Sequence, residues 1–200
     1  MRRPFLALAL IVVAFVPARA QDAARDPGRD AAAALKLLAT PGHFGIMRHA
    51  TAPGGGDPPG FTLDDCATQR NLSDGGRDEA RAMGRAIRSA LAPSDLARLR
   101  LRSSQWCRCL ETARLLDLGP VEPWPLVNSF FGTPEKGPPQ IAALKGALAT
   151  LDLSAPLLVV SHHTVVIGLS GAAPRSGEMV ILRREPSGAL AVAARVPPPN

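Results

Sequence analysis

The stretch PLLVVSHH at residues 156–163 contains the clearest buried-strand pattern of the chain. A continuous run of branched apolar residues is typical of a strand that is covered on both faces of a parallel sheet. The strand is predicted to end at Ser161, so that His162 and His163 follow directly at its carboxyl end. In open α/β sheets, ligands bind just beyond the carboxyl ends of the strands. This stretch therefore predicts an α/β fold with functional side chains at one edge of its sheet.

The segments around this strand alternate between strand and helix patterns. Further strands are predicted at residues 43–47, 99–103 and 121–124, and a terminal hairpin at 179–183 and 189–196. Helices are predicted at residues 30–40, 73–92, 107–116 and 141–151. Gly/Pro-rich loops are predicted at residues 52–60 and 128–139. Strands that alternate with helices predict a three-layer α/β/α sandwich with a largely parallel sheet, formed by one domain over residues 30–200.

The first twenty residues have the pattern of a secretory signal peptide. Arg2 and Arg3 precede an apolar run over residues 5–16, and Ala18 and Ala20 supply the small residues before a cleavage site. The apolar run is too short to span a bilayer. We therefore expect cleavage after Ala20, a periplasmic or secreted protein, and no stable membrane anchor afterwards. The polar residues 21–29 are predicted to be a flexible segment that precedes the domain.

Charge and composition favour a small anionic ligand over nucleic acid. The formal net charge is +6, and loss of the three arginines of residues 1–20, which contain no acid, would lower it to +3. The other arginines are dispersed, and aromatic residues make up only 4% of the chain, so few side chains are available for stacking on bases. Guanidinium groups do, however, suit bidentate binding of phosphate oxygens. The sequence gives no indication of the oligomeric state.

The chain contains three cysteines, Cys66, Cys107 and Cys109. In an oxidising compartment, an odd number leaves at least one thiol unpaired. Cys107 and Cys109 are too close in sequence to form a disulfide comfortably on a helix. We therefore expect any disulfide to join Cys66 to one of the other two.

Polar side chains follow three of the predicted strands at the point where each strand ends. Arg48 and His49 follow the first, Arg108 comes shortly after the second, and His162 follows the strand at residues 156–161. The carboxyl ends of parallel strands meet at the same edge of a sheet. Two arginines and two histidines at that edge predict a pocket for a dianion, in which one imidazole can act as a nucleophile.

Four segments of the chain resemble motifs of one known family. They are IMRHA at 46–50, RNLSDGGRDEA at 70–80, SSQWCRCLETA at 103–113 and VVSHHTVV at 159–166. In this order they resemble the motifs of the histidine phosphatase superfamily, phosphoglycerate-mutase-like branch 1, and they suggest a small exported bacterial member. The resemblance implies a phosphoglycerate-mutase-like fold and hydrolysis of a phosphomonoester or a related compound.

The resemblance also implies the roles of the site residues. His49 would be the nucleophile that becomes phosphorylated, and Arg48, Arg108 and His162 would bind the phosphoryl oxygens. Arg70, just before the Leu-Ser element, would add a further guanidinium to the substrate site. The resemblance implies no metal and no other cofactor, because cationic side chains neutralise the phosphate.

The sequence departs from the family pattern at three positions. Ala50 replaces the glycine of the Arg-His-Gly signature, and Gln105 replaces the proline that follows the second serine. In the stretch LVNSFFG at 126–132, Asn128 occupies the position of the family's general acid and is predicted to line the substrate site. An amide cannot donate a proton as a carboxylic acid does. Either a nearby carboxylate, Glu135 or Asp57, replaces the acid, or the leaving group needs no protonation, as in a phosphoamide or an anhydride.

These residues allow two other interpretations. One is a non-catalytic module, a relative that lacks the general acid and binds a phosphorylated small molecule or envelope glycan without turning it over. The other is a zinc hydrolase, in which His43, His49, His162 and His163 supply ligands. Adjacent histidines do not match the helical spacing of zinc hydrolases, and no carboxylate lies beside them in the sequence. We therefore expect no metal site.

Overall fold

The structure, a computed structural model, describes residues 27–199. The predicted signal peptide and cleavage site, and most of the predicted flexible segment, lie outside the described residues. The strands are β1 (His43–Arg48), β2 (Arg100–Ser103), β3 (Val121–Pro123), β4 (Leu157–Ser161), β5 (Met179–Arg184) and β6 (Leu190–Val196). The helices are α1 (Pro27–Lys36), α2 (Asp74–Ala90), α3 (Pro93–Leu96), α4 (Cys107–Leu116), α5 (Gly137–Thr150) and α6 (His163–Ser170).

The six strands form one sheet in the order β3-β2-β4-β1-β5-β6. β3, β2, β4 and β1 are parallel, whereas β5 and β6 pair in the antiparallel direction as a terminal hairpin. β4, the strand recognised first in the sequence, lies in the middle of the parallel part, between β2 and β1. The predicted largely parallel sheet is therefore confirmed.

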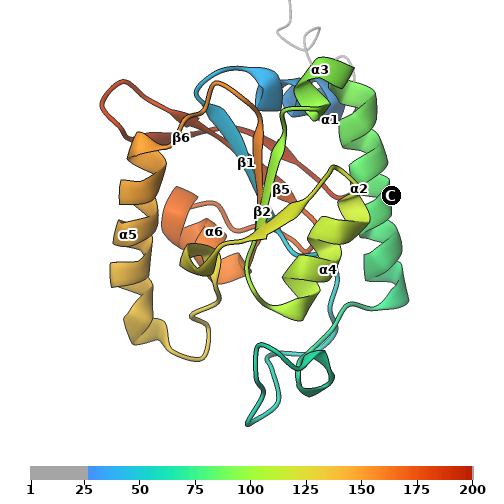
Figure 1. Ribbon diagram of the computed structural model, residues 1–200, viewed down its shortest axis with the longest axis vertical. Coiled ribbons are helices and arrows are strands. Elements are labelled where there is room, and N and C mark those ends of the chain that lie inside the picture. Colours follow the sequence, from blue (N-terminus) through green and yellow to red (C-terminus); the bar gives the residue numbers. More distant parts are fainter. Residues whose placement is uncertain (1–26, 200) are drawn as a thin grey trace, which may run out of the picture.

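Helices cover both faces of the sheet, as Figure 1 shows. α1, α2 and α4 lie on one face, and α5 and α6 lie on the other. Alternate residues of β4 enter different cores: Leu158 and Val160 pack toward the first face, and Leu157 and Val159 toward the second. A strand covered on both faces needs apolar residues at every position, which explains its unbroken apolar run. The predicted three-layer sandwich is confirmed.

The helix predicted after Ser73 is α2, which packs closely against α4. The Ser73 hydroxyl caps it by accepting a hydrogen bond from the Gly76 backbone N–H at 3.0 Å. A Cβ atom at Gly84 would collide with the backbone of Leu116 at the end of α4. Glycine at this position therefore allows the two helices to approach closely and helps to fix α4, which carries Arg108.

The structure corrects three details of the predicted elements. α1 begins at Pro27, three residues before the predicted start of this helix at residue 30. α5 begins at Gly137, because Pro138 and Pro139 fall in its first turn, where a missing N–H costs nothing. α6, which begins at His163, was not predicted, because its short apolar sequence resembles a continuation of the strand before it. No helix within residues 27–199 is both long enough and apolar enough to span a membrane.

A disulfide joins Cys66 to Cys107, and Cys109 is buried as a free thiol. Cys66 lies in a long loop between β1 and α2, and Cys107 is the first residue of α4. The bond therefore fastens this loop to the helix that carries Arg108. It also selects one of the two pairings that the sequence left open.

Removal of this disulfide is expected to destabilise the protein while the fold is retained. The bond closes a loop with a sequence separation of 41 residues. A crosslink of this length stabilises a protein by about 4 kcal/mol in the chain-entropy model. In urea unfolding under oxidising conditions, the double variant Cys66→Ala/Cys107→Ala should lose free energy of unfolding of this order. A loss within experimental error would contradict the assignment, and Cys109→Ala serves as the control for removal of a thiol outside the bond.

Candidate active site

Strand register brings the predicted site residues together at one edge of the sheet. Arg48 pairs with Ser161 in the parallel ladder between β1 and β4, and the backbone N–H of His49 donates to the Ser161 carbonyl at 2.9 Å. His49 and His162 therefore follow adjacent strands at the same height along the sheet. Their imidazole rings are 5.6 Å apart between centroids and meet edge to face.

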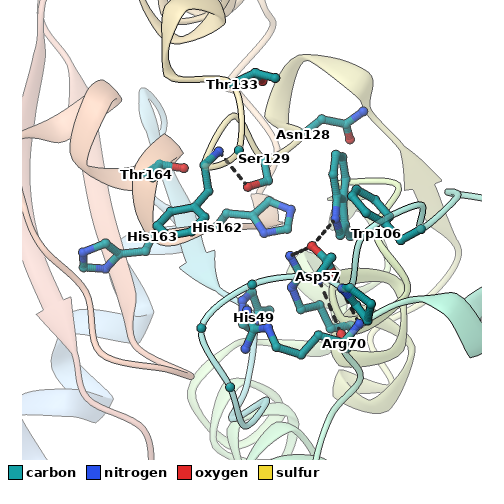
Figure 2. Close-up of a pocket in the computed structure, with 18 of the residues that line it drawn as sticks. His49, Asp57, Arg70, Trp106, Asn128, Ser129, Thr133, His162, His163 and Thr164 are labelled. Atoms are coloured by element: carbon teal, nitrogen blue, oxygen red, sulfur yellow. Dashed lines mark hydrogen bonds and ion pairs between the residues drawn. The ribbon is translucent and has the colours of Figure 1, made fainter.

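The residues at this edge line a cavity of about 1020 Å³. All six residues predicted for the site lie in its wall: Arg48, His49, Arg70, Arg108, Asn128 and His162. Figure 2 shows His49 after β1, His162 after β4, and Asp57 and Trp106 around a common space. The sequence prediction that these residues share one pocket is consistent with the structure.

His49 is held with one ring nitrogen free. It is 2% exposed, and its Nδ1 lies 2.8 Å from the carbonyl oxygen of Ala50. Because a carbonyl can only accept, Nδ1 carries the proton and Nε2 keeps a lone pair. The pKa of His49 is lowered to about 3, mainly by burial; the hydrogen bond to Ala50 opposes this effect, and the charges of the nearby arginines add to it. His49 is thus a neutral imidazole with its Nε2 available as a nucleophile.

Ala50 fits the position where the family pattern has glycine. Among residues 27–199, the only non-glycine residue with a positive φ is Asp117, so Ala50 adopts backbone angles that any residue tolerates. Its backbone N–H donates to Thr112 Oγ1 at 3.1 Å, and its carbonyl orients His49. The change from glycine therefore leaves the orientation of the nucleophile intact.

The lowered pKa of His49 predicts a pH dependence of stability. The unfolded imidazole has a pKa near 6.5 and the folded one near 3, so between these values the unfolded state binds the additional proton. The free energy of unfolding therefore rises with pH through this window and falls on acidification. From pH 7 to pH 5, His49 should account for a loss of about 2 kcal/mol. Urea unfolding should show a smaller loss for His49→Gln than for the unaltered protein, and equal losses would contradict the assignment.

His162 is enclosed by three side chains. Its Nε2 lies 2.8 Å from Ser104 Oγ and 3.4 Å from Cys109 Sγ, and the Trp106 ring meets it edge to face at 5.3 Å. Burial, followed by the charges of His49 and the nearby arginines, lowers the pKa of His162 well below its ordinary value. Burial also raises the pKa of Cys109 to about 12, so that it remains a thiol at neutral pH. Neither group is charged before a ligand binds.

The three arginines of the pocket have unused hydrogen-bond donors. The Nε atoms of Arg48, Arg70 and Arg108 are buried and have no hydrogen-bond partner among the described residues. Thr164 Oγ1, at the start of α6, shares this property. Four of the five buried side-chain atoms without a partner in residues 27–199 thus belong to residues that line this one cavity. Buried polar groups are normally paired, so these atoms indicate a ligand with several acceptor oxygens.

Asp57, from the glycine-rich loop, binds Arg108 inside the pocket. Its two carboxylate oxygens accept from the Arg108 guanidinium at 2.6 and 3.1 Å, from the Trp106 indole at 3.0 Å and from the Arg70 backbone at 3.1 Å. Burial would raise the pKa of Asp57, but these bonds and the charge of Arg108 outweigh it and hold the pKa below its ordinary value. The sequence suggested Asp57 as a proton donor. In this arrangement it is an ionised partner of Arg108.

Asn128 and Gln105 contact each other. The Gln105 backbone N–H donates to Asn128 Oδ1 at 2.9 Å, and Asn128 Nδ2 donates to Gln105 Oε1 at 2.9 Å. Asn128 Oδ1 also lies 3.2 Å from Ser104 Oγ. Two of the three positions that depart from the family pattern therefore form one local network, which the sequence alone did not reveal.

Three other residues considered from the sequence do not face the pocket centre. Glu135, the second candidate proton donor, is exposed and is not part of the cavity wall. The His163 imidazole is turned away and lies with its Nδ1 3.0 Å from the Pro174 carbonyl (Figure 2). His43 lies at the opposite end of β1, near the Pro41 carbonyl. Over residues 27–199, no group of three or more His, Cys, Asp or Glu side chains is placed to hold a metal ion.

The arrangement of elements is shared with solved phosphatase structures. No protein-family model and no curated protein matches the chain. In structure, it is similar to the protein histidine phosphatase SixA complexed with tungstate, with a TM-score of 0.50 and 18% identity over 78% of this chain and 97% of that one. It is also similar to a phosphoserine phosphatase from Entamoeba histolytica in complex with 3-phosphoglyceric acid, with a TM-score of 0.53 and 16% identity over 76% and 95%. The chain has the histidine phosphatase fold.

A third structure of this fold is a mycobacterial glucosyl-3-phosphoglycerate phosphatase with inorganic phosphate. Its TM-score with this chain is 0.51, at 12% identity over 79% of this chain and 97% of the other. The chain thus spans almost the full length of all three proteins. At these identities the similarity establishes the fold, which agrees with the prediction from the four sequence motifs.

Proposed function

We propose that this protein is a metal-independent phosphatase that hydrolyses a phosphomonoester, a phosphoamide or an anhydride through a phosphorylated His49. The observation that carries the proposal is the group of unpaired donors around His49. Three guanidinium Nε–H groups and the Thr164 hydroxyl, all buried, belong to residues that line the same cavity as a neutral imidazole. Phosphate supplies the acceptor oxygens that these donors lack, and its phosphorus is the electrophile that a neutral imidazole attacks.

In the first step, the Nε2 lone pair of His49 forms a bond to phosphorus, and the bond between phosphorus and the leaving group breaks. The leaving group takes the electron pair of that bond. The ring becomes a phosphorylated imidazolium whose positive charge is stabilised by the bond from Nδ1–H to the Ala50 carbonyl. Arg48, Arg70 and Arg108 would bind the phosphoryl oxygens and stabilise their charge in the transition state.

In the second step, water attacks phosphorus and the bond to Nε2 breaks. The electron pair returns to the ring, which leaves as neutral imidazole because Nδ1 still holds its proton. The low pKa of His49 favours this neutral product. Inorganic phosphate is released as H2PO4⁻ with both protons of the attacking water, and the cationic side chains provide the charge stabilisation that a metal ion provides in other phosphatases.

The positive charge of the pocket arginines would be neutralised partly by Asp57 and partly by the ligand. Asp57 neutralises part of the positive charge of Arg108 before substrate binds. Arg48 and Arg70 form no ion pair with a carboxylate of the described residues. Two guanidinium groups without a direct ion pair suit a phosphate dianion, which supports a phosphorylated small molecule or an envelope glycan as the ligand.

We also propose that the protein acts in the cell envelope. The signal-like pattern over residues 1–20 supports export, and the Cys66–Cys107 disulfide suits an oxidising compartment. The test is fractionation of cells that produce the full chain. Recovery of a product shortened at Ala20 from the periplasm or the medium is expected, and an uncleaved cytosolic product would contradict the proposal.

The cheapest test of the activity is hydrolysis of p-nitrophenyl phosphate in the presence of a metal chelator. Nitrophenolate is a stable anion, so turnover should not depend on a proton donor. Saturable turnover that chelation does not reduce is expected. If the folded protein binds inorganic phosphate but releases no nitrophenolate, it is a phosphate-binding module without catalysis.

A further inference from the structure

We propose that Asn128 and Gln105 form an amide bridge that positions His162 through Ser104, and that this bridge leaves the pocket without a proton donor for the leaving group. The inference rests on the proposed phosphatase activity and narrows its substrates. The preferred substrates are then phosphates whose leaving group departs as a stable anion: aryl phosphates, acyl phosphates and phosphoanhydrides.

The orientation of the bridge follows from one backbone group. The Gln105 N–H can only donate, so the Asn128 atom 2.9 Å away must be the amide oxygen. This fixes the Asn128 amide group toward Gln105 Oε1, which accepts from it at 2.9 Å. A proline at position 105 would have no N–H for this bond. The backbone N–H and the side-chain amide oxygen of Gln105 therefore both hold the Asn128 side chain against the pocket wall.

The bridge reaches His162 through a buried hydroxyl. Ser104 is completely buried, and its Oγ lies between Asn128 Oδ1 at 3.2 Å and His162 Nε2 at 2.8 Å. Cys109 and Trp106 contact the His162 ring and restrict its rotation. Asn128 does not touch His162 itself, so it is a positioning residue that acts through Ser104.

The ionisable groups of the cavity wall do not supply a proton to the leaving group. Within residues 27–199, Asp57 is the only acidic residue that lines the cavity, and it is ionised and bound to Arg108. His49 and His162 are neutral because burial lowers their pKa values. His163 faces the Pro174 carbonyl, and Lys136 is exposed at the cavity rim. Position 128 therefore presents an amide where protonation of a leaving group would need a carboxylic acid.

The experiment measures kcat/KM for a series of phosphates of rising leaving-group pKa, from p-nitrophenyl phosphate through phenyl phosphate to an alkyl phosphate. A general acid contributes about 10²- to 10⁴-fold. Without one, kcat/KM should fall on the order of 10³-fold or more along the series. Values that stay within about 10-fold of each other would show that the pocket has a proton donor, and would overturn the inference while the phosphatase activity stands. Failure to hydrolyse even p-nitrophenyl phosphate would instead overturn the proposed function.

Variants of Asn128 separate its role in positioning His162 from its inability to protonate the leaving group. Asn128→Leu removes the bridge and should lower kcat by a similar factor for every substrate, with little change in KM. Asn128→Glu places a carboxyl at the same position and should raise the ratio of alkyl to nitrophenyl phosphate turnover on the order of 10-fold. An unchanged ratio in folded Asn128→Glu would contradict the assignment of specificity to this position. Glu135→Gln is the matched control, because Glu135 lies outside the cavity wall, and it should reproduce the rates of the unaltered protein.

A separate test applies to the connection from Asn128 through Ser104 to His162, which we call the relay. If Asn128 acts through Ser104, the double variant Asn128→Leu/Ser104→Ala should lose no more kcat than the worse of the two single variants. Additive losses would show that the two residues act independently and would contradict the relay. The nitrogen chemical shifts of the His162 ring provide a second measurement, since loss of the Ser104 hydroxyl should change the shift of Nε2. An unchanged Nε2 shift would also contradict the relay.

Discussion

His49→Ala is expected to abolish turnover of p-nitrophenyl phosphate, with a loss in kcat on the order of 10⁴-fold or more. The variant removes the buried neutral imidazole whose Nε2 is free beside the three arginines. Binding of inorganic phosphate should survive, since the guanidinium donors remain. Initial rates and a phosphate titration by calorimetry measure the two effects separately.

The matched control for this variant is His163→Ala. His163 is the nearest histidine in sequence to His162, but its ring is turned toward the Pro174 carbonyl. Turnover by His163→Ala should stay within a few-fold of the unaltered protein. Equal losses for the two variants would mean that the structure has assigned the nucleophile wrongly.

Arg108→Ala is expected to affect both activity and stability. Arg108 and Asp57 are 3% and 10% exposed, and removal of the arginine leaves a buried carboxylate without its partner. Breaking a buried pair from one side costs about 3–5 kcal/mol. Loss of one guanidinium from the phosphate site should also lower kcat/KM on the order of 10³-fold. Thermal or urea unfolding and p-nitrophenyl phosphate turnover measure these two losses.

The double variant Arg108→Ala/Asp57→Ala separates the two effects. Without Asp57 no buried carboxylate is left unpaired, so most of the lost stability should return. Activity should stay low, because the phosphate site still lacks Arg108. A double variant with nearly full activity would contradict a role for Arg108 in phosphate binding.

The parts of the fold that depend on local sequence were predictable. β4 was recognised because a strand buried on both faces needs apolar residues at every position, and its alternate residues do enter both cores. α2 was recognised from the Ser73 cap and its apolar face. α6 was missed, because eight residues that are mostly apolar carry no period that distinguishes a helix from a strand.

Of the predicted pocket residues, Arg48, His49 and His162 could be predicted because they lie next to strand ends, whereas Arg70 and Asn128 were predicted from the family resemblance. His49 and His162 follow adjacent parallel strands, so sheet geometry brings them together whatever the intervening chain does. Asp57 was placed in a rim loop, but its pairing with Arg108 depends on how a loop of 16 residues between His49 and Cys66 folds back over α4. Glycine- and proline-rich sequence specifies little about such a path.

The hydrogen bonds between Asn128 and Gln105 could not be predicted from the sequence for a similar reason. The sequence identified Gln105 and Asn128 as separate departures from the family pattern. Their hydrogen bonds require the turn after β2 to meet the loop after β3, which is a tertiary contact between segments 23 residues apart. No local pattern predicts such a contact, so the amide bridge could be found only in the structure.

The most direct measurement is to quench the protein during turnover of p-nitrophenyl phosphate, digest it, and map the phosphorylated peptide under conditions that preserve acid-labile adducts. We expect a phosphoryl group on His49 that is stable in base and lost in acid. A phosphoryl group on Ser104, Cys109 or His162, or turnover by His49→Ala at the rate of the unaltered protein, would contradict it.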